Sequence, residues 1–317
     1  MVIYNILTTS IEVGLIYALL GIGVFIAFRV LDIADLGAEG VFPLGGAVTI
    51  LMITLNVPPI LAILIAMVAG GIMGFITGFL HTKLRIPSLL AGIITMVACI
   101  PLSQLFNGMT NAVDGYSQVG DFIGSITLRR DATIFNLFRG LLGEWGIILT
   151  AALAVALLIA LLYWFFGTEI GISIRATGKN KVMSRAQGIN TDNRVIGGLV
   201  ISNAIVAIGG SLFAQFMASS NSTFGQGSIV IGLASILLGE AIMLYGKHSF
   251  WYALLSVVIG SFAYQVVISI AMRVLPNGYL KIVQAVLFMA ILCIPLIKKY
   301  VGDITKKKKE RRHPENA

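Results

Sequence analysis

Apolar residues along this chain run in segments of about twenty or more, and short polar stretches separate them. A helix rises about 1.5 Å per residue, so about twenty residues cross a hydrocarbon core of roughly 30 Å. The segments are too long for barrel strands, and the pattern predicts an all-α integral membrane protein with about nine transmembrane helices, within a range of about eight to ten. The predicted spans are Ile3–Phe28, Leu36–Leu55, Pro58–Leu80, Ile86–Phe106, Trp145–Phe166, Val195–Met217, Gly227–Tyr245, Phe250–Met272 and Tyr279–Ile297.

Composition agrees with this pattern. Hydrophobic residues make up 57% of the 317 positions and charged residues 11%, and the mean hydropathy is +0.95. Soluble domains carry about 25% charged residues. The first apolar segment has neither a basic stretch before it nor a small-residue cleavage motif after it. It is therefore predicted to be the first span rather than a signal peptide.

Lysine and arginine are unevenly distributed between the two sets of loops. Nine spans place the termini on opposite sides, and the segments on the side of the C-terminus hold seventeen of the 22 basic residues. Basic residues accumulate in cytoplasmic loops, so we expect a multi-pass plasma-membrane protein with its N-terminus outside and its C-terminus in the cytoplasm. Residues 1–300 then form one transmembrane domain. The basic tail 301–317 is expected to lie against membrane lipids rather than to bind nucleic acid.

Reactive side chains are few, and their spacing follows no catalytic or metal-binding pattern. The two cysteines, Cys99 and Cys293, each fall inside a predicted span, where core packing explains them. The histidines His81, His248 and His313 lie at span ends or in the tail without an i,i+4 histidine partner, so no metal site is predicted. The stretch GISIRATGKN lacks the spacing of a phosphate-binding loop. We expect no cofactor and no enzymatic activity in this chain.

One long polar segment, residues 168–194, interrupts the apolar pattern with the sequence TEIGISIRATGKNKVMSRAQGINTDNR. Asn180 has the chemistry of a helix N-cap, the residues after it favour a helix, and Gly188 has the form of a left-handed C-cap. Val182 and Met183 share the apolar face of this helix. Two helical turns are not stable alone, so the helix needs a surface: its own bundle, the membrane, or a partner protein.

Two stretches of the chain carry a resemblance to a transporter family. The sequence GISIRATGKNKVMSRAQGINTDNRVIGGLVISNAIVAIGGSLFA resembles the coupling segment and following span of permease subunits of ATP-binding-cassette (ABC) importers of the branched-chain amino acid and ribose type. The stretch GLIYALLGIGVFIAFRVLDIADLGAEGVFPLGGAV resembles the first two helices of that family, where an acidic, glycine-rich segment leads into a broken second span. More narrowly, ADLGAEGVFPLGGAV and GFLHTKLRIPSLLAGIITM are similar to the subgroup associated with aromatic amino acid uptake.

The resemblance implies a role for the polar segment. Permeases of this family seat a short cytoplasmic helix in a cleft on an ATPase subunit, so that closure of the ATPase dimer changes the conformation of the transmembrane bundle. Gly178 and Gly188 would supply turns in this coupling segment, and the basic side chains would pair with acidic groups on the ATPase. The residues implied in ATPase coupling are Arg175, Lys179, Lys181, Val182, Met183, Arg185 and Gln187. The expected partners are ABC ATPase subunits, an extracytoplasmic solute-binding protein and a second copy of the permease.

Glycines interrupt the second and seventh predicted spans, in the stretches DLGAEGVFPLGG and STFGQGSIVIGLASILLGE. Irregular backbone at membrane depth is tolerated where it lines a cavity, and two such segments entering from opposite faces would fit an inverted repeat. Glu39, Phe42 and Gln226 flank these breaks and are the candidate residues of the translocation pathway. Close helix packing is the alternative explanation of any single glycine.

Other polar side chains fall inside or at the ends of predicted spans, where each is either part of the pathway or a hydrogen bond between helices. They are Glu12, Gln215, Glu240 and Gln265. For Glu240, Lys247 is an available partner at the inner boundary.

The segment 107–144 is the longest predicted stretch on the outer side. Ile134, Leu137, Phe138 and Leu141 repeat at helical spacing, which predicts an amphipathic helix at the membrane interface. The resemblance implies that this segment helps to receive the solute-binding protein.

These observations favour the permease subunit of an ABC importer that moves a small solute inward by ATP-driven alternating access, with an amino acid as the expected solute. A permease for a sugar or a nucleoside in the same importer class is one alternative. A stand-alone secondary transporter or channel is another, but the chain has no dense cluster of intramembrane carboxylates to bind a coupling ion. An intramembrane enzyme is disfavoured because paired catalytic groups are missing from the sequence.

Overall fold

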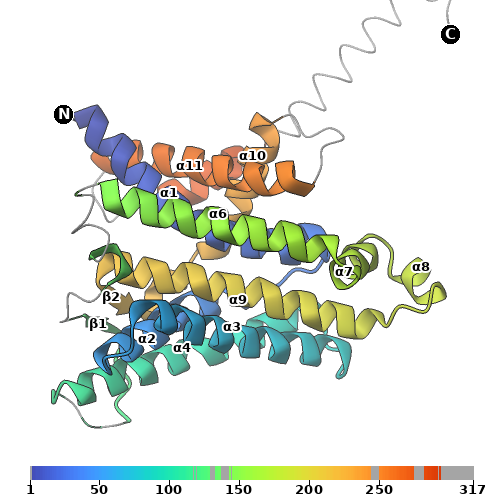
Figure 1. Ribbon diagram of the computed structural model, residues 1–317, viewed down its shortest axis with the longest axis horizontal. Helices are drawn as coiled ribbons and strands as arrows, with labels where there is room; N and C mark the ends of the chain where they lie inside the picture. Colours follow the sequence, from blue (N-terminus) through green and yellow to red (C-terminus); the bar gives the residue numbers. More distant parts are fainter. Residues whose placement is uncertain are drawn as a thin grey trace, which may run out of the picture.

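The computed structural model of the protein is a bundle of long helices that run roughly parallel or antiparallel (Figure 1). It describes residues 2–116, 118, 120–128, 133–136, 143, 145–243, 250–274, 282–291 and 293. The helices are α1 (Val2–Phe25), α2 (Ala38–Thr54), α3 (Pro59–Thr82), α4 (Ser88–Val113), α6 (Trp145–Gly167), α7 (Glu169–Lys179), α8 (Lys181–Ala186), α9 (Thr191–Met217), α10 (Ser228–Ile242) and α11 (Phe250–Val274). The short elements are the π-helix η1 (Ile26–Val30), the 3₁₀-helix η2 (Ser222–Gly225), and the antiparallel strands β1 (Ser125–Thr127) and β2 (Ser219–Asn221).

The helices confirm an all-α membrane protein. Within the described residues, seven helices are long and apolar enough to cross a membrane, and two shorter apolar helices occupy Ala38–Thr54 and Ile282–Ile291. Every predicted span overlaps one of these nine helices. The count of nine spans and the inverted repeat stay predictions, because the two short helices fall below the length that crosses a bilayer unaided.

Small residues let the helices approach closely. Helix α3 packs along α9, and a Cβ atom added to Gly74 would lie 2.9 Å from the Leu199 carbonyl carbon, closer than real side chains approach. Membrane helices use small residues in this way because lipid offers no hydrophobic driving force for their association. Helices α3 and α9 are therefore in close contact, and α2 and α4 pack beside them (Figure 1).

Two spans are broken near the middle of the bundle. After η1 the chain turns back without helical structure through residues 31–37, and α2 begins beside the middle of α9. After α9, the chain passes through β2 and η2 before α10 begins. Helix α10 itself has 15 residues, about 22 Å, and reaches the 21 residues of the candidate span Ser222–Ile242 only together with η2.

The N-terminus and the α7–α8 segment lie at opposite ends of the bundle (Figure 1). The paired strands β1 and β2 lie at the same end as the N-terminus. This arrangement agrees with the prediction that the N-terminus and the coupling segment are on opposite sides of the membrane. Which end faces the cytoplasm stays a prediction.

The predicted interfacial helix is described only in part. The amide of Ile134 donates a hydrogen bond to Gln215 Oε1 at 3.0 Å, and the buried Phe135 ring meets Phe216 edge-on with ring centroids 6.0 Å apart. These contacts fasten the start of the segment to the end of α9. Leu137, Phe138 and Leu141, which carry the predicted apolar face, lie outside the described residues.

Candidate coupling surface and translocation pathway

The polar segment forms two helices, α7 and α8, rather than the single short helix that the sequence predicts. Thr168 caps α7 by accepting a hydrogen bond from the Gly171 amide at 3.3 Å. Asn180 ends α7 and caps α8, since its Oδ1 accepts a hydrogen bond from the Met183 amide at 3.0 Å. The predicted N-cap at Asn180 is confirmed, and Thr168 is a second cap that the prediction missed.

The end of α8 has the predicted left-handed cap. Gly188 has φ +80°, and its amide donates to the Arg185 carbonyl at 3.0 Å. The Ile189 amide donates to the Ser184 carbonyl, also at 3.0 Å. This pair of bonds is the Schellman motif, which favours glycine because a Cβ is strained at positive φ.

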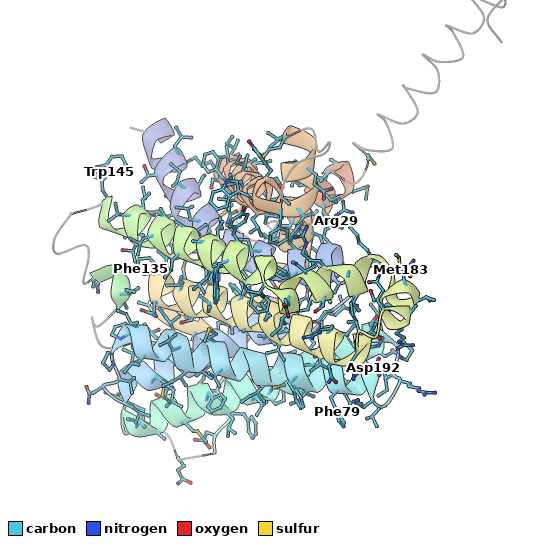
Figure 2. The ribbon with its side chains drawn as sticks, turned by 45° about the vertical axis from the view of Figure 1, so that its right-hand side comes forward. Arg29, Phe79, Phe135, Trp145, Met183 and Asp192 are labelled. Atoms are coloured by element: carbon cyan, nitrogen blue, oxygen red, sulfur yellow. The ribbon has the colours of Figure 1, made fainter. Side chains whose placement is uncertain are left out.

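Helix α8 presents its apolar side chains outward at the tip of the bundle. Val182 is 80% exposed and Met183 is 60% exposed, whereas Ser184 is buried. Figure 2 shows Met183 at the end of the bundle opposite to Phe135 and Trp145. Exposed apolar side chains on a helix of six residues are expected where a partner protein covers them.

Arg185 points back to its own bundle. Its Nε donates to Thr191 Oγ1 at 2.7 Å, and its guanidinium pairs with Asp192 at 3.0 Å. Asp192 lies at the start of α9 (Figure 2). Arg185 therefore fixes α8 to α9, in addition to any contact with a partner.

The other predicted coupling residues fall into two groups. Lys181 on α8 and Gln187 directly after α8 are both exposed, and they lie on either side of Val182 and Met183 in the sequence. Arg175 and Lys179 lie on α7 and line a cavity against the body of the bundle. The structure therefore does not gather the seven predicted residues on one surface.

The position of Gly178 differs from the one predicted from the sequence. It was expected in a turn but lies inside α7, one residue before the end of the helix. A Cβ atom at this position would lie 2.8 Å from the Val30 carbonyl carbon and 2.9 Å from Leu31 Cα. The glycine therefore allows backbone contact between α7 and the end of η1.

Beyond η1 the chain leads directly to the broken second span. The Leu31 amide donates to the Ile26 carbonyl at 3.0 Å, the Ile33 amide donates to the Ala27 carbonyl at 2.9 Å, and Asp32 has φ +56°. Wide π-turns of this kind are frequent at functional sites. The contact between Gly178 and Val30 thus connects α7 to residues 31–37.

Asp35 anchors the broken span deep in the bundle. Its side chain is 1% exposed. Its Oδ1 accepts a hydrogen bond from the Gly37 amide at 2.8 Å, and its Oδ2 accepts one from Asn203 Nδ2 at 2.7 Å. Asn203 lies 12 residues into the 27-residue helix α9, about 18 Å from its start and near its middle.

Sequence reasoning missed Asp35 and Asn203 as a pair. An Asp two residues before a Gly, as in ADLG, is a local signal for a turn in which the carboxylate accepts the later amide. Nothing local indicates that Asn203 supplies the second donor, because the two residues are 168 positions apart.

Glu39 joins the two broken spans. Its Oε1 accepts a hydrogen bond from the Gly227 amide at 3.1 Å, and the Ile229 amide also interacts with this carboxylate. Gly225 lies so close to the Glu39 backbone that a Cβ would lie 3.0 Å from its carbonyl carbon. A carboxylate is favourable here because the first amides of α10 have no partner within their own helix.

The structure therefore brings Glu39 and Gln226 together, although the sequence placed them at opposite boundaries of the bundle. Gln226 precedes Gly227 and is exposed, and Glu39 is half-buried. The starts of α2 and α10 consequently meet in the interior of the bundle, with α2 leading to the β1–β2 end and α10 to the α7–α8 end. We call this place, formed by residues 35–41 and 225–229, the junction.

Phe42 lies behind the junction rather than at its surface. It is 1% exposed and stacks on Tyr17 with ring centroids 5.8 Å apart. The ring centroid of Phe213 lies 5.6 Å from that of Phe42, and the ring centroid of Phe224 lies 5.2 Å from that of Phe213. This aromatic cluster packs α1, α2 and α9 together beside the break in the seventh span.

The remaining intramembrane polar residues serve mainly in contacts between elements. Glu240 pairs with Arg29, rather than with Lys247, which lies outside the described residues. Gln215 holds the segment at Ile134. Gln265 is buried on α11, and Glu12 is partly buried on α1.

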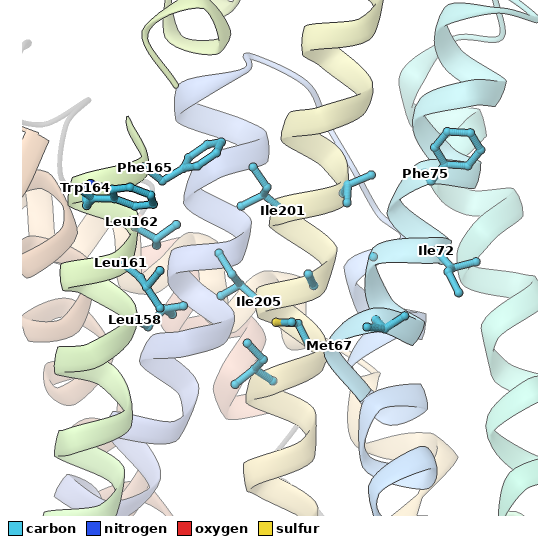
Figure 3. Close-up of a pocket in the computed structure, with 15 residues that line it drawn as sticks. Met67, Ile72, Phe75, Leu158, Leu161, Leu162, Trp164, Phe165, Ile201 and Ile205 are labelled. Carbon is cyan, nitrogen blue, oxygen red and sulfur yellow. The ribbon is translucent and has the colours of Figure 1, made fainter. Parts of the chain in front are cut away.

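A groove of about 600 Å³ runs along the bundle between α3 and α6, with α9 beneath it. Its lining is hydrophobic, with Met67 and Ile72 from α3, Leu158 from α6, and Ile201 and Ile205 from α9 (Figure 3). The groove offers no charged or hydrogen-bonding group apart from the Trp164 indole. It is suited to lipid and not to a polar solute.

Comparison with known proteins identifies the family. The family model described as "Branched-chain amino acid transport system / permease component" matches residues 6–292. A tyrosine transport system permease protein of Clostridioides difficile is 32% identical over 280 residues, covering 88% of each chain. The ribose import permease RbsC of Haemophilus influenzae is 24% identical and covers 73% of this chain and 67% of its own.

A third relative is a probable branched-chain amino acid transport permease, LivH, of Methanocaldococcus jannaschii, which is 25% identical and covers 72% of this chain and 73% of its own. No solved structure matches the chain. The family model spans nearly all of the transmembrane region, including α7, α8 and the junction. The chain therefore belongs to the family of branched-chain amino acid transport permeases.

Proposed function

We propose that this permease moves an amino acid inward along a pathway that passes the junction of α2 and α10, and that ATP hydrolysis on a separate subunit drives the movement through α7 and α8. The single observation that carries the proposal is that the starts of two helices meet partway along the bundle, beside the half-buried Glu39 and the exposed Gln226.

Polar groups at this depth need an aqueous or polar surrounding. An ionised carboxylate in hydrocarbon costs at least about 2.5 kcal/mol, so such groups face a cavity or another polypeptide. Gln226 is exposed on the single chain, and Glu39 is only half-buried. A second copy of the permease, facing this surface, would enclose a pathway between the two junctions.

The chemistry of the junction suits a zwitterion. The positive ends of the α2 and α10 dipoles favour an anionic group such as a carboxylate, and the half-buried carboxylate of Glu39 favours an ammonium group. The similarity to a tyrosine permease supports an aromatic amino acid. The similarity to a ribose permease makes a sugar the second candidate.

The tip of the bundle suits energy coupling. Val182 and Met183 would enter an apolar cleft on the ATPase, and the Gly178–Val30 contact would carry the movement of α7 to η1 and the broken second span. In this arrangement the α7–α8 end faces the cytoplasm. The β1–β2 end faces outward and receives the extracytoplasmic solute-binding protein.

Reconstituted uptake tests the proposal. Proteoliposomes that contain the permease and its ATPase, supplied with the solute-binding protein, should accumulate a labelled aromatic amino acid only when ATP is present at the α7–α8 side. A panel of amino acids, ribose and nucleosides should rank the substrates. Glu39→Gln should change the rate or the ranking while the ATPase still co-purifies. Uptake without the ATPase, driven by an ion gradient, would identify a secondary transporter instead.

A further inference from the structure

A cationic cavity of about 430 Å³ lies at the α7–α8 end of the bundle, between η1, α7, α10 and α11. Three basic residues line it, Arg29, Arg175 and Lys179, together with one carboxylate, Glu240. The side chains of Phe25 and Phe250 form part of its wall. The cavity therefore combines an excess of positive charge with an apolar surface.

The excess positive charge of the cavity is carried by two residues of α7. Arg29 pairs with Glu240, so these two residues largely neutralise each other. Arg175 and Lys179 make no ion pair with any residue in the part of the chain that the structure describes. Both are exposed to the cavity mouth. Two cations therefore remain for an anionic ligand.

Aromatic side chains continue from this cavity along the end of α6. The Arg175 guanidinium lies over the Phe250 ring, 4.9 Å from its centroid. The same two residues line a neighbouring cavity of about 580 Å³ together with Tyr163, Trp164 and Thr168. Trp164 is 68% exposed and Tyr163 is 53% exposed. Exposed Trp and Tyr at the end of an apolar helix are typical of the boundary between membrane and water.

We propose that these joined cavities bind an anionic phospholipid, with its phosphodiester at Arg175 and Lys179 and its glycerol and first methylenes against Trp164 and Tyr163. Arginine forms forked hydrogen bonds with phosphate oxygens, and basic pockets beside transmembrane helices select anionic headgroups. A soluble phosphate would satisfy the cations but would leave the aromatic surface without a partner. The combination of both surfaces therefore selects a lipid.

The position of the site gives the lipid a regulatory role. Arg175 and Lys179 lie on α7, which contacts η1 and leads into α8. A lipid held between α7 and Phe250 of α11 would restrain α7 against the bundle. The transport rate should then depend on the fraction of anionic lipid in the bilayer, independently of which solute is carried.

Fluorescence quenching of Trp164 tests lipid binding directly. The full-length permease, with Trp145→Phe and Trp251→Phe so that Trp164 is the sole tryptophan, is placed in phosphatidylcholine nanodiscs that contain a minor fraction of brominated phosphatidylglycerol or brominated phosphatidylcholine. Each cation near the membrane surface favours an anionic lipid by about fivefold, so two give an enrichment of about 30-fold. Brominated phosphatidylglycerol should therefore quench Trp164 at a much lower mole fraction than brominated phosphatidylcholine.

Matched variants distinguish lipid binding at these cavities from a general effect of positive surface charge. Lys179→Gln should lower the phosphatidylglycerol preference about fivefold, and Arg175→Gln combined with it should abolish the preference. Lys181→Gln makes the same change of charge on α8, outside both cavities, and should leave the preference intact. Lys179→Arg should retain it.

Three outcomes would overturn the proposal. Equal quenching by the two brominated lipids would show that no anionic lipid is selected. An equal loss of preference in Lys181→Gln would assign the effect to surface charge. If inorganic phosphate at millimolar concentration binds to the cavities while phosphatidylglycerol is not enriched near Trp164, the cavities are a site for a soluble anion.

Discussion

Replacing Gly178 by alanine tests the contact that joins the coupling segment to the broken second span. The added Cβ would lie 2.8 Å from the Val30 carbonyl carbon, whereas ordinary van der Waals contact begins at 3.4 Å. The Val30 carbonyl oxygen lies closer still to the added Cβ, so the backbones of α7 and η1 would have to separate by more than 0.6 Å. Gly178→Ala should consequently disturb the path by which α7 moves η1.

The expected magnitude follows from two opposing effects. Overpacking of a tight contact costs about 1–3 kcal/mol. Alanine in a helix interior is more favourable than glycine by about 1 kcal/mol, so the net destabilisation is about 0–2 kcal/mol. Gly197→Ala is the matched control, because Gly197 lies in α9 with no atom within 4 Å of the added Cβ. That control should be neutral or slightly stabilising.

The assay is the ratio of solute transported to ATP hydrolysed, in proteoliposomes that contain the ATPase and the solute-binding protein. Gly178→Ala should assemble with the ATPase and hydrolyse ATP, but it should transport fewer solute molecules per ATP. Gly197→Ala should keep the parent ratio. Equal ratios in both variants would refute the idea that movement passes from α7 to η1 at this contact.

Three further perturbations test the coupling surface, the junction and the topology. Val182→Asp should place an unpaired charge in the ATPase interface, weaken association by about 3 kcal/mol or roughly a hundredfold, and stop co-purification of the ATPase. Leu84→Asp, which changes another exposed apolar residue, should not do so. Asp35→Ala should lower the free energy of unfolding by about 2–4 kcal/mol, because it removes two hydrogen bonds to a buried carboxylate; an unchanged thermal midpoint in detergent would contradict this. Ser219→Cys should react with an impermeant thiol reagent from outside and Gln187→Cys only from inside, and reaction of both from one side would contradict the proposed topology.

Local sequence signals account for much of the fold and of the coupling surface. The apolar segments predicted the positions of the helices, Asn180 predicted the start of α8, and Gly188 predicted its end. Each of these features depends on residues within a few positions of one another. The exposure of Val182 and Met183 also agrees with the partner contact that the sequence suggested.

The junction could not be predicted because it depends on contacts between distant parts of the chain. Glu39 and Gly227 are 188 positions apart, and no local pattern shows that the amides of one broken span meet the carboxylate of the other. Gly178 was misread for a different reason. Glycine near a polar boundary favours a turn, but the caps at Thr168 and Asn180 enclose a complete helix. Only the proximity of Val30 explains why that helix needs a glycine.

Thiol accessibility at Gln226 tests whether the junction lines the translocation pathway. Gln226→Cys, in a background with Cys99→Ser and Cys293→Ser, is treated with a charged, membrane-impermeant thiol reagent in the assembled importer. Leu157→Cys is the control, because Leu157 is an exposed apolar residue in the middle of α6. Gln226→Cys should react at a rate that changes between the nucleotide-free and ATP-bound states, while Leu157→Cys should stay unreactive in both. A Gln226→Cys variant as unreactive as Leu157→Cys in every state would show that the junction does not line the pathway.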